Sequence, residues 1–228
     1  MSNSKLLSIQ QILNYETKGS NYLNINSSKQ EKSLRDVVNT LLSNLQQKYP
    51  NLSFELKNKI YLSDIASEIN NFENETFFSP IFKTTFISPD GGFLFLVDNI
   101  TNKKYPILIS EMKYQGSNSS FKGNAIERLG KNVIALRNYF INHEILPFVT
   151  FCSGPDFNPS KSKIIDRLST IACFAPLNKI NLFKYGSINP GSYFCREEEW
   201  DFDEIYSICE EIATRSILYF ASKNGIKI

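Results

Sequence analysis

The chain has 228 residues, which is enough for one large domain or two small ones with a sizeable buried core. Its formal net charge of +2 does not indicate a polycationic nucleic-acid binder, although it leaves room for a locally basic surface. The single histidine argues against a histidine-based metal-finger nuclease and against a Ser-His-Asp triad.

The first half of the chain predicts two helices and a group of strands after a polar start. Residues 1–31 are rich in Ser, Asn and Lys, and we expect an N-terminal arm there, ahead of a single domain over 32–228. An apolar stripe predicts a helix over 32–48, and Ser63 or Asp64 can cap a second helix. Apolar runs predict strands over 82–87, 93–98 and 105–113, the last two joined by a hairpin turn.

The second half alternates between helical and extended patterns. A helix is expected from about 123 to 140, followed by a buried parallel strand over 146–152. Further elements are an amphipathic helix over 162–173, short strands near 182–183 and 193–195, and a final helix over 201–221 that a capping box starts. This order predicts an α/β fold with a mixed central β-sheet flanked by helices.

The charged residues Asp90, Glu111 and Lys113 form the most informative pattern. Asp90 follows a proline and precedes two glycines, so we expect it in a bend at a strand edge. Glu111 and Lys113 are two residues apart in an apolar run, and the strand period of two places both on one face. Two carboxylates can hold a hard divalent cation, and an amine beside them can handle a water or a phosphate oxygen. The pattern therefore fits metal-dependent hydrolysis of a phosphodiester.

Each half of this pattern also has an ordinary structural explanation. Pro-Asp is common in turns, and Glu-x-Lys at a strand end is often a solvated charge pair. The order of the two halves, each beside an apolar strand, favours the chemical interpretation. Basic residues gather around the motif, which suits a polyanionic substrate: Lys103, Lys104, Lys113, Lys122, Arg128, Lys131 and Arg137.

Three segments in this order resemble one known family: 88–92 (SPDGG), 111–116 (EMKYQG) and 123–128 (GNAIER). They are similar to the EcoRI-type type II restriction endonucleases, and the likeness extends over about residues 35 to 220. The resemblance implies a restriction-endonuclease-like, PD-(D/E)xK fold. It also implies a homodimer that cuts double-stranded DNA at a palindrome.

The resemblance assigns the chemistry to matching positions. Asp90, Glu111 and Lys113 match the catalytic motif. The metal of the family is Mg²⁺, held by the two carboxylates and by the backbone carbonyl that corresponds to Met112. The implied reaction is in-line attack of water on a backbone phosphate, which leaves 5′-phosphate ends and 5′ overhangs.

The resemblance also assigns the residues that contact DNA, and their chemistry suits the roles, since Asn pairs well with adenine and Arg with guanine. Residues that match the readers of an inner AATT are Asn124, Glu127 and Arg128. Ala125 belongs to the same hexapeptide, and Lys131 shares the helix face of Asn124 and Arg128. Arg167 matches a reader of the outer guanine, and Gln115 matches a segment beside the DNA.

The role of Glu127 stays open between three interpretations. Its carboxylate can pair with Arg128 of the partner subunit, accept from an adenine amino group, or serve as a surface i, i+4 partner of Lys131. The outer base pair is open as well. Arg167 makes GAATTC the first choice, but 117–122 is much shorter than the insertion of the family's best-known member. A relaxed or different outer pair therefore remains an alternative.

Two other functions compete with restriction. One is a structure-specific repair nuclease, such as a junction resolvase, which the base-reading hexapeptide disfavours. The other is a DNA-binding repressor without cleavage, which the intact catalytic set disfavours. A functional restriction enzyme would also require a cognate DNA methyltransferase in the host, with no direct contact expected.

The remaining features predict a cytoplasmic protein that does not contact membranes. The start of the chain is polar, and no apolar run approaches the roughly 20 residues of a membrane span. Its four cysteines form no C-x-x-C pair and lie in apolar surroundings. We therefore expect buried free thiols in a reducing compartment.

Overall fold

The computed structural model describes residues 20–74, 76, 79, 83–115, 124–158, 163, 164, 167, 168 and 192–228, with side chains from residue 28 onward except those of Ile141 and Ser192. The strand expected near 182–183 and most of the helix expected over 162–173 lie outside these residues.

A five-stranded mixed sheet forms the centre of the protein, in the order β1-β4-β5-β6-β7. Its strands are β1 (Ser53–Lys57), β4 (Phe93–Val97), β5 (Lys104–Tyr114), β6 (Phe148–Ser153) and β7 (Ser192–Arg196). The pairs β1–β4 and β4–β5 are antiparallel, and β5–β6 and β6–β7 are parallel. The predicted mixed sheet and the predicted hairpin between β4 and β5 are confirmed.

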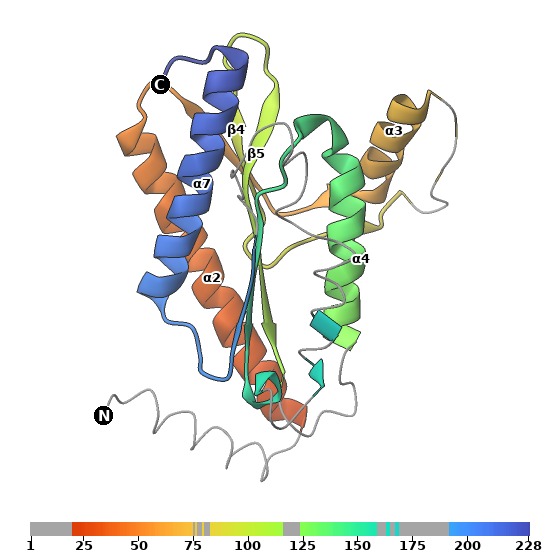
Figure 1. The fold of residues 1–228 in the computed structure, drawn as a ribbon, viewed down its shortest axis with the longest axis vertical. Helices are drawn as coiled ribbons and strands as arrows, with labels where there is room; N and C mark the ends of the chain where they lie inside the picture. The colour runs from red at the N-terminus through yellow and green to blue at the C-terminus, as the bar shows by residue number, and fades with distance from the viewer. Residues whose placement is uncertain are drawn as a thin grey trace.

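Helices cover both faces of this sheet (Figure 1). On one face lie α2 (Ser20–Lys48) and α7 (Phe202–Asn224), and on the other lie α3 (Leu62–Glu73) and α4 (Asn124–Tyr139). Two short strands, β2 (Ile60–Tyr61) and β3 (Phe86–Ile87), pair in a separate small sheet. Strand β3 leads into a turn, and the chain then enters β4 of the central sheet.

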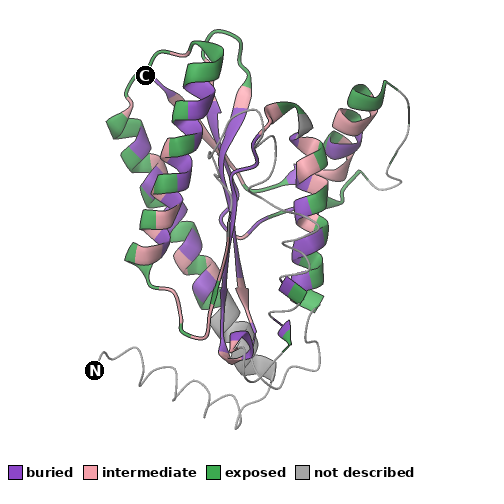
Figure 2. Cartoon of the chain, in the orientation of Figure 1, coloured by how far each residue is buried: buried purple, intermediate pink, exposed green. Residues whose placement is uncertain are grey.

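The sheet separates two apolar cores, and its buried strands lie between the helices in Figure 2. Strand β4 shows how alternation divides them. Leu94 and Leu96 pack with α2 and α7, whereas Phe93 and Phe95 pack with α3 and α4. Every residue of β6 is buried, as expected for a parallel strand that is covered on both faces. This burial holds the central strands, including the one that carries Glu111, in a fixed register.

Some expected boundaries were wrong. Helix α2 begins at Ser20, twelve positions before the helix expected from residue 32, and it crosses the proposed arm boundary. Its residue Gln30 is buried and accepts a hydrogen bond from the Ser153 hydroxyl, so packing against the sheet favours helix where composition favoured an arm. The arm assigned to 1–31 is otherwise a prediction, because residues 1–19 lie outside the described part.

Helix α3 begins without the predicted side-chain cap. Its N-cap is Tyr61, which makes no capping side-chain bond, and Ser63 and Asp64 lie in the first turn. Strand β2 runs directly into this helix, and the Leu62 amide donates to the Thr85 carbonyl at 2.9 Å. The backbone of a neighbouring segment thus accepts a hydrogen bond from the start of the helix, where a capping side chain would otherwise be the acceptor.

The final helix forms as predicted. Asp201 accepts from the Glu204 amide, and the Glu204 side chain accepts from the Asp201 amide, which completes a capping box. No helix within the described residues is both long and apolar enough to cross a membrane.

The cysteines agree only in part with the prediction. Cys152 and Cys209 are buried free thiols whose pKa burial raises. Cys195 is also free but exposed, so the expected burial is wrong there, and Cys173 lies outside the described residues.

Acid is expected to destabilise the fold through His143, the only histidine of the chain. Burial, reinforced by Lys103 and Lys223, lowers the pKa of His143 to about 4. Its ordinary value is 6.5. The unfolded chain therefore binds this proton first, and stability falls as pH drops from about 6.5 towards 4, by roughly 3 kcal/mol at full extent.

The measurement is the free energy of unfolding against pH for the wild type and for His143→Phe, which keeps an aromatic ring among Tyr105, Phe140 and Phe220. The wild type should lose more stability than the variant between pH 7 and 4. If the free energy of unfolding fell equally with pH in both proteins, His143 would not be a buried neutral residue with a lowered pKa.

Candidate active site

A tight turn between β3 and β4 positions Asp90. The Gly91 amide donates to the Ser110 carbonyl at 2.9 Å, and the Gly92 amide donates to the Pro89 carbonyl at 3.0 Å. Gly92 has a φ of +76°, which favours glycine, and a Cβ there would meet the Lys57 carbonyl oxygen at 2.7 Å. The turn is therefore fixed against β5, directly beside Glu111.

The three predicted catalytic residues converge. The Lys113 ammonium lies 2.5 Å from Glu111 Oε1 and 3.3 Å from Asp90 Oδ2. It also donates to the Met112 carbonyl at 3.1 Å. The Met112 amide donates to Asp90 Oδ2 at 2.9 Å, so the turn and the strand share a direct bond. Both carboxylates and the carbonyl assigned to metal binding thus surround one cationic group.

Burial and charge compete at this cluster. Burial raises the pKa of Glu111, whose residue is 4% exposed, and Asp90 raises it further, while Lys113 and the Asn132 side chain lower it. Burial alone lowers the pKa of Lys113, but Glu111 and Asp90 outweigh it and the pKa is raised overall. The ammonium form of Lys113 is therefore stabilised by its two carboxylates.

The cluster fits a hard divalent cation. Glu111 Oε2 is buried and has no hydrogen-bond partner, so one carboxylate oxygen is desolvated without compensation. The donors are two carboxylates and one carbonyl, the oxygen set that Mg²⁺ prefers. Within the described residues no group of three or more His, Cys, Asp and Glu side chains gathers.

The predicted DNA-binding residues of α4 lie on its outer face. Asn124 is its first residue, and Asn124, Glu127, Arg128 and Lys131 are all exposed, while Ala125 is partly buried. The inner face carries the buried side chains Ile126, Leu129, Val133 and Leu136. One helix therefore offers polar groups outward and is anchored to the sheet by its apolar face.

Two further predicted contacts have different surroundings. The Arg167 guanidinium lies 3.9 Å from the Glu127 carboxylate, so these exposed residues are brought together although forty positions separate them. Gln115 is buried at 7% exposure, its backbone N–H donates to the Ser153 carbonyl, and its side-chain Oε1 has no hydrogen-bond partner. Gln115 is thus enclosed in this structure instead of exposed to solvent. Gly116 to Gly123 lie outside the described residues.

Sequence reasoning missed two residues that contact the catalytic set. Arg35 of α2 donates through Nε to the Asp90 carbonyl at 3.2 Å, and the Asn132 side chain of α4 is near enough to Glu111 to lower its pKa. Arg35 is 55 positions from Asp90, so no local spacing relates them. Asn132 follows Lys131 on the predicted DNA-reading helix, and a helical projection that places it toward the sheet is the signal that could have identified it.

Gly91→Ala is expected to displace the catalytic turn. A Cβ at Gly91 would lie 2.0 Å from Ser110 Oγ, 3.1 Å from Val38 and 3.2 Å from Leu34. We expect about 1–3 kcal/mol of destabilisation from overpacking, and a rate loss of order 10²-fold because Asp90 moves.

Adding Ser110→Ala should recover part of both losses, because that hydroxyl is buried without a hydrogen-bond partner and its removal opens the space. Unfolding curves and cleavage rates of the single and double variants test this. Equal activity of Gly91→Ala and the wild type would contradict the close packing of the turn.

The comparison with known proteins decides the family. The model of the family "Restriction endonuclease EcoRI" matches residues 17–227, which is nearly the whole chain. The chain belongs to the EcoRI family. Its membership confirms the predicted enzyme class, restriction endonuclease, and the restriction-endonuclease-like fold.

Two curated relatives of the EcoRI family are similar to this chain. It is 30% identical over 148 residues to the type II restriction enzyme RsrI of Cereibacter sphaeroides, covering 58% of this chain and 53% of that enzyme. It is 23% identical over 219 residues to the type II restriction enzyme EcoRI of Escherichia coli, covering 76% of this chain and 79% of that enzyme. The first match thus spans about half the length of its relative.

Proposed function

We propose that this chain hydrolyses double-stranded DNA at a palindrome that contains AATT, with GAATTC as the first choice and Mg²⁺ as the cofactor. The single observation that supports the chemistry is the convergence of Asp90, Glu111 and the Met112 carbonyl on one ammonium, with Glu111 Oε2 buried and unpartnered. Type II restriction enzymes are among its relatives, and restriction endonucleases in general use divalent metal ions.

Each catalytic residue has a role that follows from its surroundings. When bound, the cation supplies charge neutralisation at the scissile phosphate and a more acidic attacking water. Asp90 and Glu111 hold that cation through oxygens that the turn and β5 keep in place. The two carboxylates raise the pKa of Lys113, and its ammonium would offset charge that develops on the phosphate oxygens. The products carry 5′-phosphate ends with 5′ overhangs.

Recognition is assigned to the outer face of α4 and to Arg167. Asn124 and Arg128 present donors and acceptors suited to adenine and to purine N7, and each good pair contributes roughly 1–3 kcal/mol of discrimination. Glu127 lies beside Arg167, which suggests that it orients that arginine toward the outer base pair. Two copies of the chain related by two-fold symmetry would read the two half-sites of the palindrome, so a homodimer is part of the proposal.

A digest separates this function from its competitors. The protein is incubated with linear phage DNA, and separately with a four-way DNA junction, each with Mg²⁺ or a chelator. Discrete phage fragments that require Mg²⁺ are the expected result. Cutting confined to the junction would indicate a structure-specific nuclease, and a mobility shift without cutting would indicate a binding protein.

A further inference from the structure

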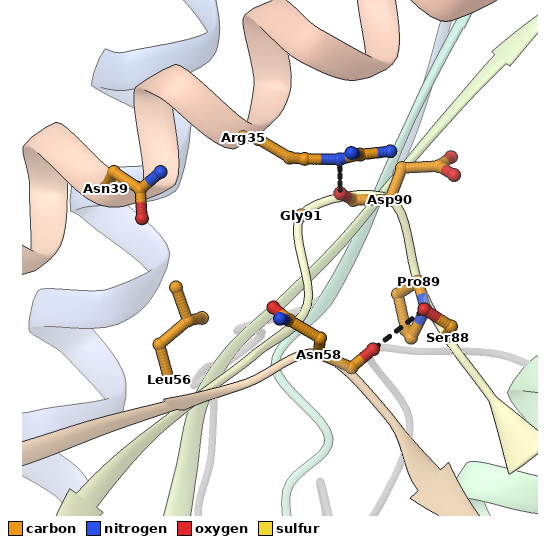
Figure 3. Close-up of a pocket in the computed structure, with 8 residues that line it drawn as sticks. All are labelled: Arg35, Asn39, Leu56, Asn58, Ser88, Pro89, Asp90 and Gly91. Carbon is orange, nitrogen blue, oxygen red and sulfur yellow. Dashed lines mark hydrogen bonds between the residues drawn. The ribbon is translucent and has the colours of Figure 1, made fainter.

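A polar cavity of about 520 Å³ adjoins the catalytic turn on the side of α2. Its wall includes Ser88 to Gly91, Arg35 and Asn39 from α2, and Asn58 after β1. Figure 3 shows these residues surrounding the space, with Asn39 and Asn58 on opposite sides and Arg35 extended across the turn. The cavity and the catalytic cluster thus share one wall, the turn that carries Asp90.

Arg35 connects the cavity to the turn. Its Nε donates to the Asp90 carbonyl at 3.2 Å, which leaves the terminal guanidinium nitrogens to face other acceptors. Nη2 lies 3.8 Å from Glu31 in an i, i+4 pair, with the Arg35 side chain 61% exposed. Such an exposed pair contributes little and yields readily to a stronger acceptor. Arg35 can therefore hold the turn and bind an anion together.

The other groups of the cavity also favour an anion. Asn39 and Asn58 each carry an amide that can donate. Asp90 is the one carboxylate among the described lining residues, and in Figure 3 its side chain points away from Asn39 and Asn58. The Asp90 carboxylate instead accepts a hydrogen bond from the Lys113 ammonium. Ser88 donates to the Asn58 carbonyl at 2.8 Å, which ties the β1–β2 connection to the turn.

The spacing of DNA phosphates suggests the occupant. Each strand carries one phosphate for about every 3.4 Å of helix axis. A strand with its scissile phosphate at Asp90 must therefore carry further phosphates across the surface on either side of this turn. The guanidinium fork of Arg35 matches phosphate geometry and binds it bidentately.

We propose that this cavity is a phosphate-binding subsite, in which Arg35, assisted by Asn39 and Asn58, holds a DNA backbone phosphate next to the scissile one. This inference rests on the proposed function, because it takes DNA as the substrate. Through its bond to the Asp90 carbonyl, Arg35 also couples occupation of this subsite to the position of a metal ligand. Arg35 is a positioning residue for the reaction.

The test combines a protein variant with a neutralised phosphate. Arg35→Gln keeps a donor near the turn but removes the charge. Arg215→Gln is the matched control, because Arg215 is also exposed and pairs with Glu211 at i, i+4, on α7 away from the cavity. Binding to a GAATTC duplex is measured in a chelator at several salt concentrations. The duplexes carry one methylphosphonate per strand, placed in turn at each symmetry-related pair of positions.

The proposal predicts three results for Arg35→Gln. Binding weakens at least about tenfold, and the salt dependence of log K against log salt falls by about 2, which is 0.9 for each lost contact in a symmetric dimer. One methylphosphonate position weakens wild-type binding but has no further effect on Arg35→Gln. Arg215→Gln behaves as the wild type at every position.

Two results would overturn the subsite. One is that Arg35→Gln matches Arg215→Gln in affinity and salt dependence. The other is that Arg35→Gln cuts more slowly while every methylphosphonate weakens it as much as the wild type, which would leave Arg35 a purely structural support of the turn. Cleavage of the unmodified duplex by the wild type with Mg²⁺ is scored separately. Failure of that reaction would reject the proposed function instead.

Discussion

Replacing Glu111 with Gln is expected to lower the Mg²⁺-dependent cleavage rate by at least about 10³-fold, while binding to a cognate duplex stays within a few-fold of the wild type. A metal ligand contributes several kcal/mol to the transition state, and each 1.4 kcal/mol is a factor of ten in rate. Glutamine has the same shape but cannot supply the negative oxygen. Glu111 lies beneath the turn beside Lys113 and is 4% exposed, so it offers no surface for reading bases.

The measurement pairs single-turnover cleavage with mobility shifts. Glu198→Gln, which changes an exposed glutamate outside the cluster, is the control and should cut at the wild-type rate. Removing one partner of a buried ion pair can also destabilise the fold, so the melting temperature of each variant is recorded. Asp90→Asn provides a second test at a more accessible carboxylate and should lose cleavage similarly. Retained Mg²⁺-dependent cutting by Glu111→Gln would refute its assignment as a metal ligand.

Replacing Arg128 with Gln is expected to weaken specific binding by about 2–6 kcal/mol, since each bidentate base contact contributes roughly 1–3 kcal/mol and a symmetric dimer has two. Discrimination should fall most at the base pair that Arg128 reads, and cleavage of the cognate site should fall with it. Non-specific binding should change little beyond the loss of one charge per subunit. Arg128 is exposed on the outer face of α4, so its replacement is not expected to disturb the core.

Lys131→Gln is the matched comparison, because Lys131 is exposed on the same helix and we assign it no base. Its loss should weaken binding about equally for all sequences and reduce the salt dependence. Competition assays with single-base-pair substitutions at each position of the site distinguish the two behaviours. If Arg128→Gln lowers affinity uniformly, as expected for Lys131→Gln, Arg128 contacts the backbone and the proposed reading is wrong.

Much of the framework was predictable because local patterns and global packing agree. The hairpin of β4 and β5, the helix from Asn124 and the final helix all carry strong periodicity or a capping box. The convergence of Asp90 with Glu111 and Lys113 was also predictable. The strand period of two places the side chains of Glu111 and Lys113 on one face, and the glycine-containing turn can bring Asp90 beside them. Strand β1 was not predicted, since each of its residues is only partly buried and its alternation is weak.

Contacts between distant segments were not predictable from spacing. Arg35 reaches Asp90 across 55 positions, and Arg167 approaches Glu127 across forty. For Gln115, the sequence did not predict burial. It shares the strand parity of Glu111 and Lys113, and the resemblance implied a position beside DNA. The approach of Ser153 and Gly154 at the end of β6 encloses it instead.

Sequencing the ends of phage DNA fragments produced with Mg²⁺ reports cleavage, the recognition site and strand polarity in one measurement. We expect one class of ends with 5′-phosphates, 5′ overhangs containing AATT and a constant outer base pair, first choice G·C. Ends of scattered sequence, or no ends above those of a chelator control, would contradict a site-specific nuclease built on Asp90, Glu111 and Lys113.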